Sequence, residues 1–165
     1  MRNFIIGSVL LLAVIGLGFA GFGWWRSHHP VHPPHVNAAE YESDMTEALV
    51  RGILDQLDAK APHTCFLAFG EGLTPPGSDF LARFKGARLT VRTCHAAVAP
   101  PNGKYYDIIS GQEGLMLHVL KIKEFIALHY DVTVSLSNLP AGHNLFIYRI
   151  GNLGGDWKIE SCKPA

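Results

Sequence analysis

Residues Ile126 to Ser137 read IALHYDVTVSLS, and this stretch decides the fold because its side chains alternate in character with a period of two. Successive side chains of a strand point to opposite faces of a sheet, so one face here receives apolar residues and the other mainly polar ones. The pattern predicts one long, half-buried strand. Its apolar face carries Ile126, Leu128, Tyr130, Val132, Val134 and Leu136, and its other face carries Ala127, His129, Asp131, Thr133, Ser135 and Ser137.

Further strands are predicted on both sides of this one. Residues 145–150 and 157–161 form two apolar runs separated by a Gly-rich segment, which is typical of a hairpin. Leu115 to Ile122 is another apolar run, and a period of two also begins at Arg88. Pro100 to Gly103 supplies a turn before a short run at 105–109.

A helix is predicted before the strands. Asn37 and Glu40 have the spacing of a capping box, and apolar residues recur at steps of three and four from Tyr41 to Leu57. Ala61-Pro62 ends the pattern, because the residue before a proline disfavours helical backbone. The predicted fold class is α+β, in which this helix packs on a curved antiparallel sheet of four to six strands.

The amino-terminal segment has a different character. Phe4 to Trp25 contains no charged residue, and as a helix it would reach about 33 Å, enough to cross a bilayer. Residues 1–25 are therefore predicted to be a transmembrane signal-anchor that places the rest of the chain outside the cytoplasm, at a bacterial inner membrane. Gly18-Phe19-Ala20 leaves a cleaved secretory signal as the alternative, which would make the domain secreted or periplasmic.

Residues 26–36, RSHHPVHPPHV, are predicted to form an extended linker, because three prolines exclude helix and sheet. The linker carries His28, His29, His32 and His35, and neutral imidazoles bind zinc, copper or nickel. The spacing matches no closed structural metal site, so a plain spacer is the competing interpretation.

Residues 37–165 are long enough for one domain. Two of the 14 basic residues, Arg2 and Arg26, precede Asn37, which leaves 12 basic against 14 acidic residues and a net charge of −2. This balance, without a cluster of Lys and Arg, argues against a nucleic-acid partner. A protein partner and the membrane remain as predicted partners, and no cofactor is predicted.

The chain contains three cysteines, Cys65, Cys94 and Cys162. In an exported protein they allow one bridge and leave one thiol, and Cys65 to Cys94 is the predicted disulfide. Three separate buried thiols are the alternative.

Candidate catalytic and binding residues are few. Glu71 lies between two glycines, where a loop can place a carboxylate in a cleft. His129 and Asp131 share one face of the predicted long strand and could line a pocket with His118 of a neighbouring strand. The alternatives are a turn residue at Glu71 and a solvated sheet face. Because nucleophile elbows, phosphate-binding glycine loops and paired CxxC motifs are absent from the sequence, catalysis is not indicated.

The segment CFLAFGEG at 65–72, followed by DFLARF at 79–84, resembles a family of small uncharacterised bacterial proteins with a cysteine-led Gly-Glu-Gly segment. The resemblance extends from Pro62 to Cys162 and implies a shape and cysteine placement, but no activity. The order of helix and strands is also similar to the nuclear transport factor two-like (cystatin-like) fold, whose concave face binds small molecules or proteins. That likeness is an analogy of fold, which does not determine function.

The sequence thus predicts a membrane-anchored extracytoplasmic domain that acts as a non-catalytic binding or structural module of the bacterial envelope. Two alternatives belong to other classes. One is a small enzyme with a cleft near Glu71 and the sheet-face histidines, and the other is metal binding by the linker.

Overall fold

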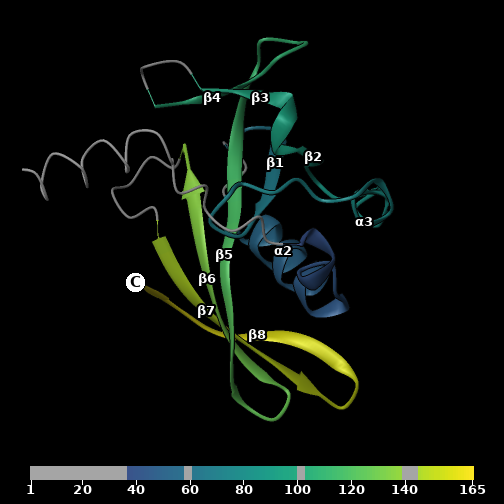
Figure 1. Ribbon diagram of the computed structural model, residues 1–165, viewed down its shortest axis with the longest axis vertical. Coiled ribbons are helices and arrows are strands. Elements are labelled where there is room, and N and C mark those ends of the chain that lie inside the picture. Colours follow the sequence, from purple (N-terminus) through teal and green to yellow (C-terminus); the bar gives the residue numbers. More distant parts are fainter. Residues whose placement is uncertain (1–36, 58–60, 100–102, 139–144) are drawn as a thin grey trace, which may run out of the picture. The chain divides into compact units, whose positions relative to one another are not determined.

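The computed structural model describes residues 37–57, 61–99, 103–138 and 145–165. A single sheet dominates this part of the chain, and one long helix covers one of its faces (Figure 1). The helical elements are η1 (Ala38–Glu40), α2 (Asp44–Gln56), α3 (Ser78–Ala82) and η2 (Cys94–Ala96). The strands are β1 (Thr64–Phe69), β2 (Thr90–Thr93), β3 (Ala97–Val98), β4 (Tyr105–Asp107), β5 (Glu113–Ile126), β6 (His129–Ser137), β7 (Leu145–Leu153) and β8 (Asp156–Pro164).

The sheet is mixed. Its strand order is β2-β1-β5-β6-β7-β8, and the short β3–β4 pair joins it through β4, which pairs with β5. The strands from β5 to β8 form an antiparallel meander, whereas β1 lies parallel to both β2 and β5. The predicted fold class is therefore wrong in its sheet, because the described residues form eight strands with two parallel pairings.

The composition of β1 explains this difference. Residues Cys65 to Phe69 are completely buried, and a strand that is covered on both faces is a continuous apolar run without alternation. Such a run gives no period-two signal. The sequence consequently indicated an apolar segment here, without its place in the centre of the sheet.

The predicted long strand from Ile126 to Ser137 is also corrected. Ile126 pairs with His129 across a two-residue turn at Ala127 and Leu128, so that β5 ends where the strand was expected to begin. Leu128 adopts φ 62°, a left-handed conformation that is uncommon for leucine. The alternation of apolar and polar residues continues through the turn, so the sequence pattern does not reveal the turn.

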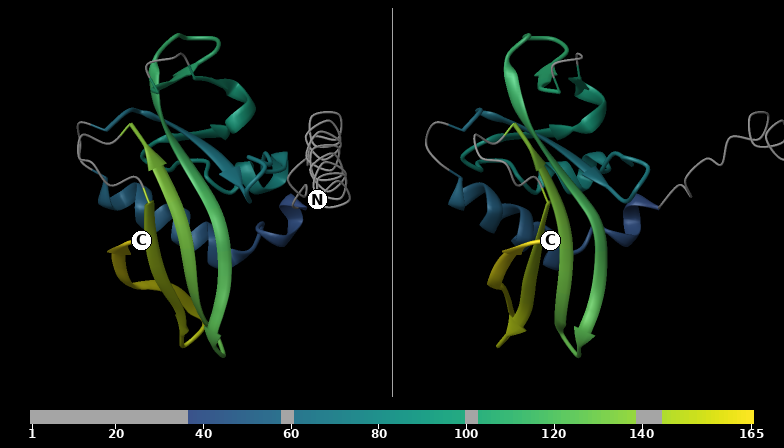
Figure 2. Two further views of the ribbon diagram at one scale, coloured as in Figure 1. Left: turned by 60° about the vertical axis from the view of Figure 1, so that its left-hand side comes forward. Right: turned by 90° about the vertical axis from the view of Figure 1, so that its left-hand side faces the viewer.

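The predicted helix is present but begins later than expected. Asn37 caps only the single turn η1, and the α-helix starts after Ser43, whose Oγ accepts the amide of Thr46 at 3.2 Å. The helix buries one stripe against the sheet: Met45, Thr46, Leu49, Val50, Ile53 and Leu54. Figure 2 shows α2 running across the face of the sheet that β5, β6 and β7 present to it.

Apolar cores lie on both faces of the central strands. The larger one, between α2 and the sheet, includes Cys65, Leu67 and Phe69. The smaller one, on the opposite face, contains Phe66, Ala68, Cys94 and Met116 and packs against Tyr105 of β4. Each core uses alternate residues of β1, as the pleat of a strand requires.

This arrangement overturns the predicted disulfide. All three cysteines are free, and Cys65 belongs to the core beneath α2 whereas Cys94 belongs to the core on the opposite face. The sheet therefore separates the two thiols. The Cys94 Sγ donates to the carbonyl of Leu73 at 3.2 Å.

The structure bears on the predicted transmembrane helix only through the residues that it describes. No helix in the described ranges is long and apolar enough to cross a bilayer. Residues 1–25, which were predicted to form the signal-anchor, lie outside these ranges, and so does the linker at 26–36.

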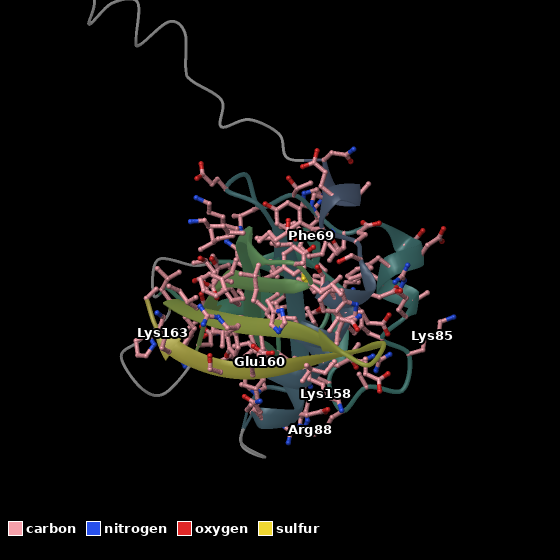
Figure 3. The ribbon with its side chains drawn as sticks, turned by 90° about the horizontal axis from the view of Figure 1, so that it is seen from below. Phe69, Lys85, Arg88, Lys158, Glu160 and Lys163 are labelled. Carbon is pink, nitrogen blue, oxygen red and sulfur yellow. The ribbon has the colours of Figure 1, made fainter. Side chains whose placement is uncertain are left out.

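The edge strand β8 is visible in Figure 3, where Lys158, Glu160 and Lys163 are labelled along it. Within the described sheet it pairs only with β7, and charged side chains on an edge strand hinder pairing with other chains. The helix α2 approaches β8 closely, since a Cβ on Gly52 would lie 2.7 Å from the Cδ1 of Ile159.

Candidate functional site

An open groove of about 580 Å³ lies where the start of α2 meets the sheet. Residues from four regions line it: Glu40, Tyr41, Ser43, Asp44 and Met45 around η1 and α2, Ile122 of β5, Tyr130 of β6 and Trp157 of β8. A volume of this size is in the usual range for small-molecule sites. The groove therefore has the size of a small-molecule site.

A β-bulge gives the groove its apolar floor. Val119 pairs with Val134 and Lys121 pairs with Thr133, so Leu120 is an extra residue in β5. The extra residue shifts the alternation by one position, which turns Lys121 to the opposite face and directs Ile122 toward the groove.

The same bulge holds one wall in place. Tyr41 donates its hydroxyl to the carbonyl of Leu120 at 3.4 Å, and its ring stacks on Phe69 with 5.4 Å between centroids. One face of the Tyr41 ring is thus already packed against the core. The hydrogen bond of the hydroxyl and the stacking of the ring together fix the orientation of the Tyr41 side chain.

Two further aromatic rings stand on the sheet side of the groove. Tyr130 and Trp157 come from β6 and β8, and their ring centroids are 5.8 Å apart with an interplanar angle of 59°. Both side chains are half-buried. An aromatic ring presents a negative face, which attracts a positively charged group placed over it.

The rim of the groove is acidic. Glu40 and Asp44 are exposed at its helical side. Glu124 is the direct cross-strand partner of Tyr130, and directly opposed residues of an antiparallel pair lie on the same face. One cation is near, because Arg83 binds Asp44 at 2.9 Å.

The electrostatic effect of these carboxylates reaches Tyr41. Burial is the main cause that raises the pKa of the Tyr41 hydroxyl, and the negative charges of Glu40 and Glu71 raise it further. Both the predicted candidate Glu71 and the rim residue Glu40 therefore contribute negative potential at the groove.

Glu71 itself is exposed in the turn between β1 and α3 and does not line the groove. The turn begins at Gly70, which has φ 61°, and closes where Phe69 bridges to Thr74. The carbonyl of Gly70 is hydrogen-bonded to a ring nitrogen of His118. Burial lowers the pKa of His118 and favours its neutral form.

The other two sheet candidates lie on the opposite face from the groove, because they alternate with Tyr130. Asp131 accepts two hydrogen bonds from Arg149, at 2.8 and 3.1 Å, and these bonds lower its pKa. His129 contacts Glu160 at 3.1 Å. His118, His129 and Asp131 thus each have a separate partner, and the structure does not gather them in one pocket.

The histidines of the predicted metal tract, His28, His29, His32 and His35, lie outside the described residues. Within the described ranges, His, Cys, Asp and Glu form no group of three that could hold a metal ion.

The sequence patterns did not single out Tyr130 and Trp157, which line the groove. Tyr130 was assigned to the apolar face of a strand and Trp157 to a hairpin, and both assignments describe a core equally well. The available signal was that Tyr130 of β6 lies directly opposite Glu124 of β5 and that Trp157 of β8 reaches the Tyr130 ring. These contacts require the strand order, which the sequence pattern does not contain.

Comparisons with family models, with curated proteins and with solved structures find no match for this chain. The resemblance to the Gly-Glu-Gly family and the analogy with the nuclear transport factor two-like fold therefore stay predictions.

Proposed function

We propose that the domain is a non-catalytic binding module and that the groove at the start of α2 binds a positively charged ligand. The single observation that carries this proposal is the combination of aromatic walls and an acidic rim at one groove. Neither feature alone would indicate a cation.

The chemistry of the lining supports a bound ligand without a reaction. Tyr130 and Trp157 supply ring faces that attract a cation, and Met45 and Ile122 supply an apolar floor. Glu40 and Glu124 add net negative charge, which raises the local concentration of cations and speeds their association. Such an arrangement fits a ligand that is charged at one point and apolar around it.

The experiment is a titration of the full-length chain, followed by NMR. Tetramethylammonium and ethylammonium are the cationic probes and acetate is the anionic one. We expect both cations to shift the Trp157 indole N–H, which a W157F variant identifies among the three tryptophans of the chain. Added salt should weaken the response, because exposed carboxylates are screened.

A matched pair of variants tests the role of the rim. E40Q/E124Q removes Glu40, which lines the groove, and Glu124, which lies opposite the lining residue Tyr130. D79N/E113Q removes two carboxylates that neither line the groove nor pair with a residue that does. The first pair should weaken cation binding and the second should leave it unchanged. Equal effects of the two pairs, or no response of Trp157 to either cation, would overturn the proposal.

A further inference from the structure

Within the described ranges, α2 covers one face of β5 to β8 and leaves the other face open (Figure 2). On β6, Val132 and Val134 point toward α2 and are completely buried, whereas the residues that alternate with them are only half-buried. This open face consists of Asp131, Thr133 and Ser135 of β6, together with the residues of β5, β7 and β8 that oppose them in register.

Strand pairing collects lysines on the open face that are dispersed in the sequence. Lys121 and Lys123 of β5 are paired with open-face residues of β6. Lys158 and Lys163 of β8 are paired with residues of β7 that oppose the same side of β6. Directly opposed residues share a face, so all four lysines project from this one, and all four are exposed.

The carboxylates of the open face are already engaged. Asp131 accepts two hydrogen bonds from Arg149, and Glu160 contacts His129 at 3.1 Å. The bonds from Arg149 are the main cause that lowers the pKa of Asp131, and the charges of Lys163 and Lys123 lower it further. In the described part of the chain the four lysines take part in no ion pair. The open face therefore carries an excess of positive charge in a domain whose net charge is −2.

The lysines form two lines with a nearly neutral strip between them. Because β6 and β7 separate β5 from β8, three strand spacings of about 4.8 Å place the lines roughly 14 Å apart. The strip contains the Asp131–Arg149 pair, Thr133, Ile147 and the partly exposed Leu145. An α-helix with its side chains is about 10 to 12 Å wide, so one helix fits along the strip with a line of lysines on each flank.

A continuous polyanion fits this face poorly. Asp131 and Glu160 lie between the two lines, and a nucleic acid or an anionic membrane would bring negative charge against them. A protein segment carries carboxylates at discrete positions and can place them beside the lysines only. Glutamates four residues apart on a helix are separated by about 6 Å, close to the roughly 7 Å between Lys121 and Lys123.

We propose that the open face binds an acidic helix of a partner protein. The carboxylates of this helix pair with the lysines of β5 on one flank and with those of β8 on the other, and its apolar stripe covers Ile147 and Leu145. The contact lies on the opposite side of the sheet from the groove. It therefore goes beyond the proposed function, and neither proposal depends on the other.

The test is a titration of the full-length chain with helical peptides of about 20 residues. One peptide carries glutamates on both flanks of a leucine and alanine stripe, the second has glutamine at those positions, and the third has lysine. We expect only the acidic peptide to bind in fluorescence anisotropy and to shift the amide NMR signals of β6 and β7, and added salt should weaken its binding. Equal binding of the acidic and glutamine peptides would overturn the proposal.

Two pairs of lysine variants and one control pair locate the contact. K121Q/K123Q and K158Q/K163Q should each lower the affinity for the acidic peptide about fivefold, the effect expected of two exposed ion pairs. K85Q/K104Q removes two exposed charges outside the open face and should leave the affinity unchanged. An effect of one lysine line without an effect of the other would contradict a helix that lies between them.

A last comparison separates the kinds of partner. An oligothymidylate of about 15 nucleotides represents a continuous polyanion. Binding of this probe that is tighter than binding of the acidic peptide, with the same dependence on the lysines, would overturn the choice of a protein partner. The response of Trp157 to tetramethylammonium reports on the groove alone, so failure at one face is distinguished from failure at the other.

Discussion

The ring of Phe66 on β1 lies against the backbone of Gly114 on β5. A Cβ on Gly114 would come within 3.0 Å of the Phe66 Cζ and closer still to another atom of the ring. Both residues are fully buried, so the ring has little room to move.

Gly114→Ala should therefore destabilise the protein by about 1 to 3 kcal/mol through overpacking. Gly72→Ala is the matched control, because the nearest atom to its added Cβ is 3.9 Å away. Urea denaturation followed by circular dichroism gives both values. A G114A protein as stable as G72A would contradict the packing described here.

The pH dependence of stability should reflect His118. Its pKa is lowered by burial in the folded state, so below the unfolded value of about 6.5 the unfolded chain binds the proton more readily. The contribution to stability is complete above that pH and is lost as the pH falls toward the folded pKa. The free energy of unfolding of the wild type should decline over this window.

A His118→Gln variant should show a smaller decline than the wild type across the same window. His95→Gln, at an exposed position, is the control and should keep the wild-type slope. Denaturant titrations at several pH values measure these slopes. Parallel curves for the wild type and H118Q would refute the assignment.

Thiol reactivity should separate the three cysteines. Cys162 is exposed, Cys94 is buried, and complete burial raises the pKa of Cys65 to about 12. Ellman's reagent at pH 8 should therefore modify one thiol rapidly in the folded protein, because the thiolate is the reacting form. In denaturant without reductant, all three thiols should react. A count of one reactive thiol would instead support the predicted disulfide between Cys65 and Cys94.

The start of α2 can be tested at its cap. Ser43→Ala removes the acceptor for the Thr46 amide and should cost about 1 kcal/mol. Ser78→Ala is the control, since its Oγ reaches only the neighbouring Asp79 at 3.4 Å. Thermal denaturation compares the two variants. A larger loss for S78A would place the main helix boundary elsewhere.

A substitution at Leu128, in the turn between β5 and β6, should stabilise the protein. Leu128 holds φ 62° and is 54% exposed, so Leu128→Asn relieves backbone strain and loses little buried area. We expect a gain of about 1 kcal/mol, since left-handed backbone costs leucine roughly that much more. Leu145→Asn, inside β7, should give no gain, and a loss of stability in L128N would argue for an uninterrupted strand.

Local patterns predicted the helix stripe, the C-terminal hairpin and the apolar face of β6 well. They failed where tertiary context decides. The turn at Leu128 has no glycine or asparagine to mark it, and β1 has no alternation because both its faces are covered. The groove was hidden for a related reason, since Tyr130 and Trp157 meet only through the order of the strands.

The central position of β1 has a consequence for how the chain folds. Cys65 pairs with Leu115 of β5, whereas β6, β7 and β8 pair only with their neighbours in sequence. Closing a long loop before any contact compensates for it slows folding. The meander is thus expected to assemble as an early nucleus, and β1, together with the helix α2 that precedes it, should dock onto the meander late. Pulsed hydrogen exchange would show this order as delayed amide protection at residues 64–69.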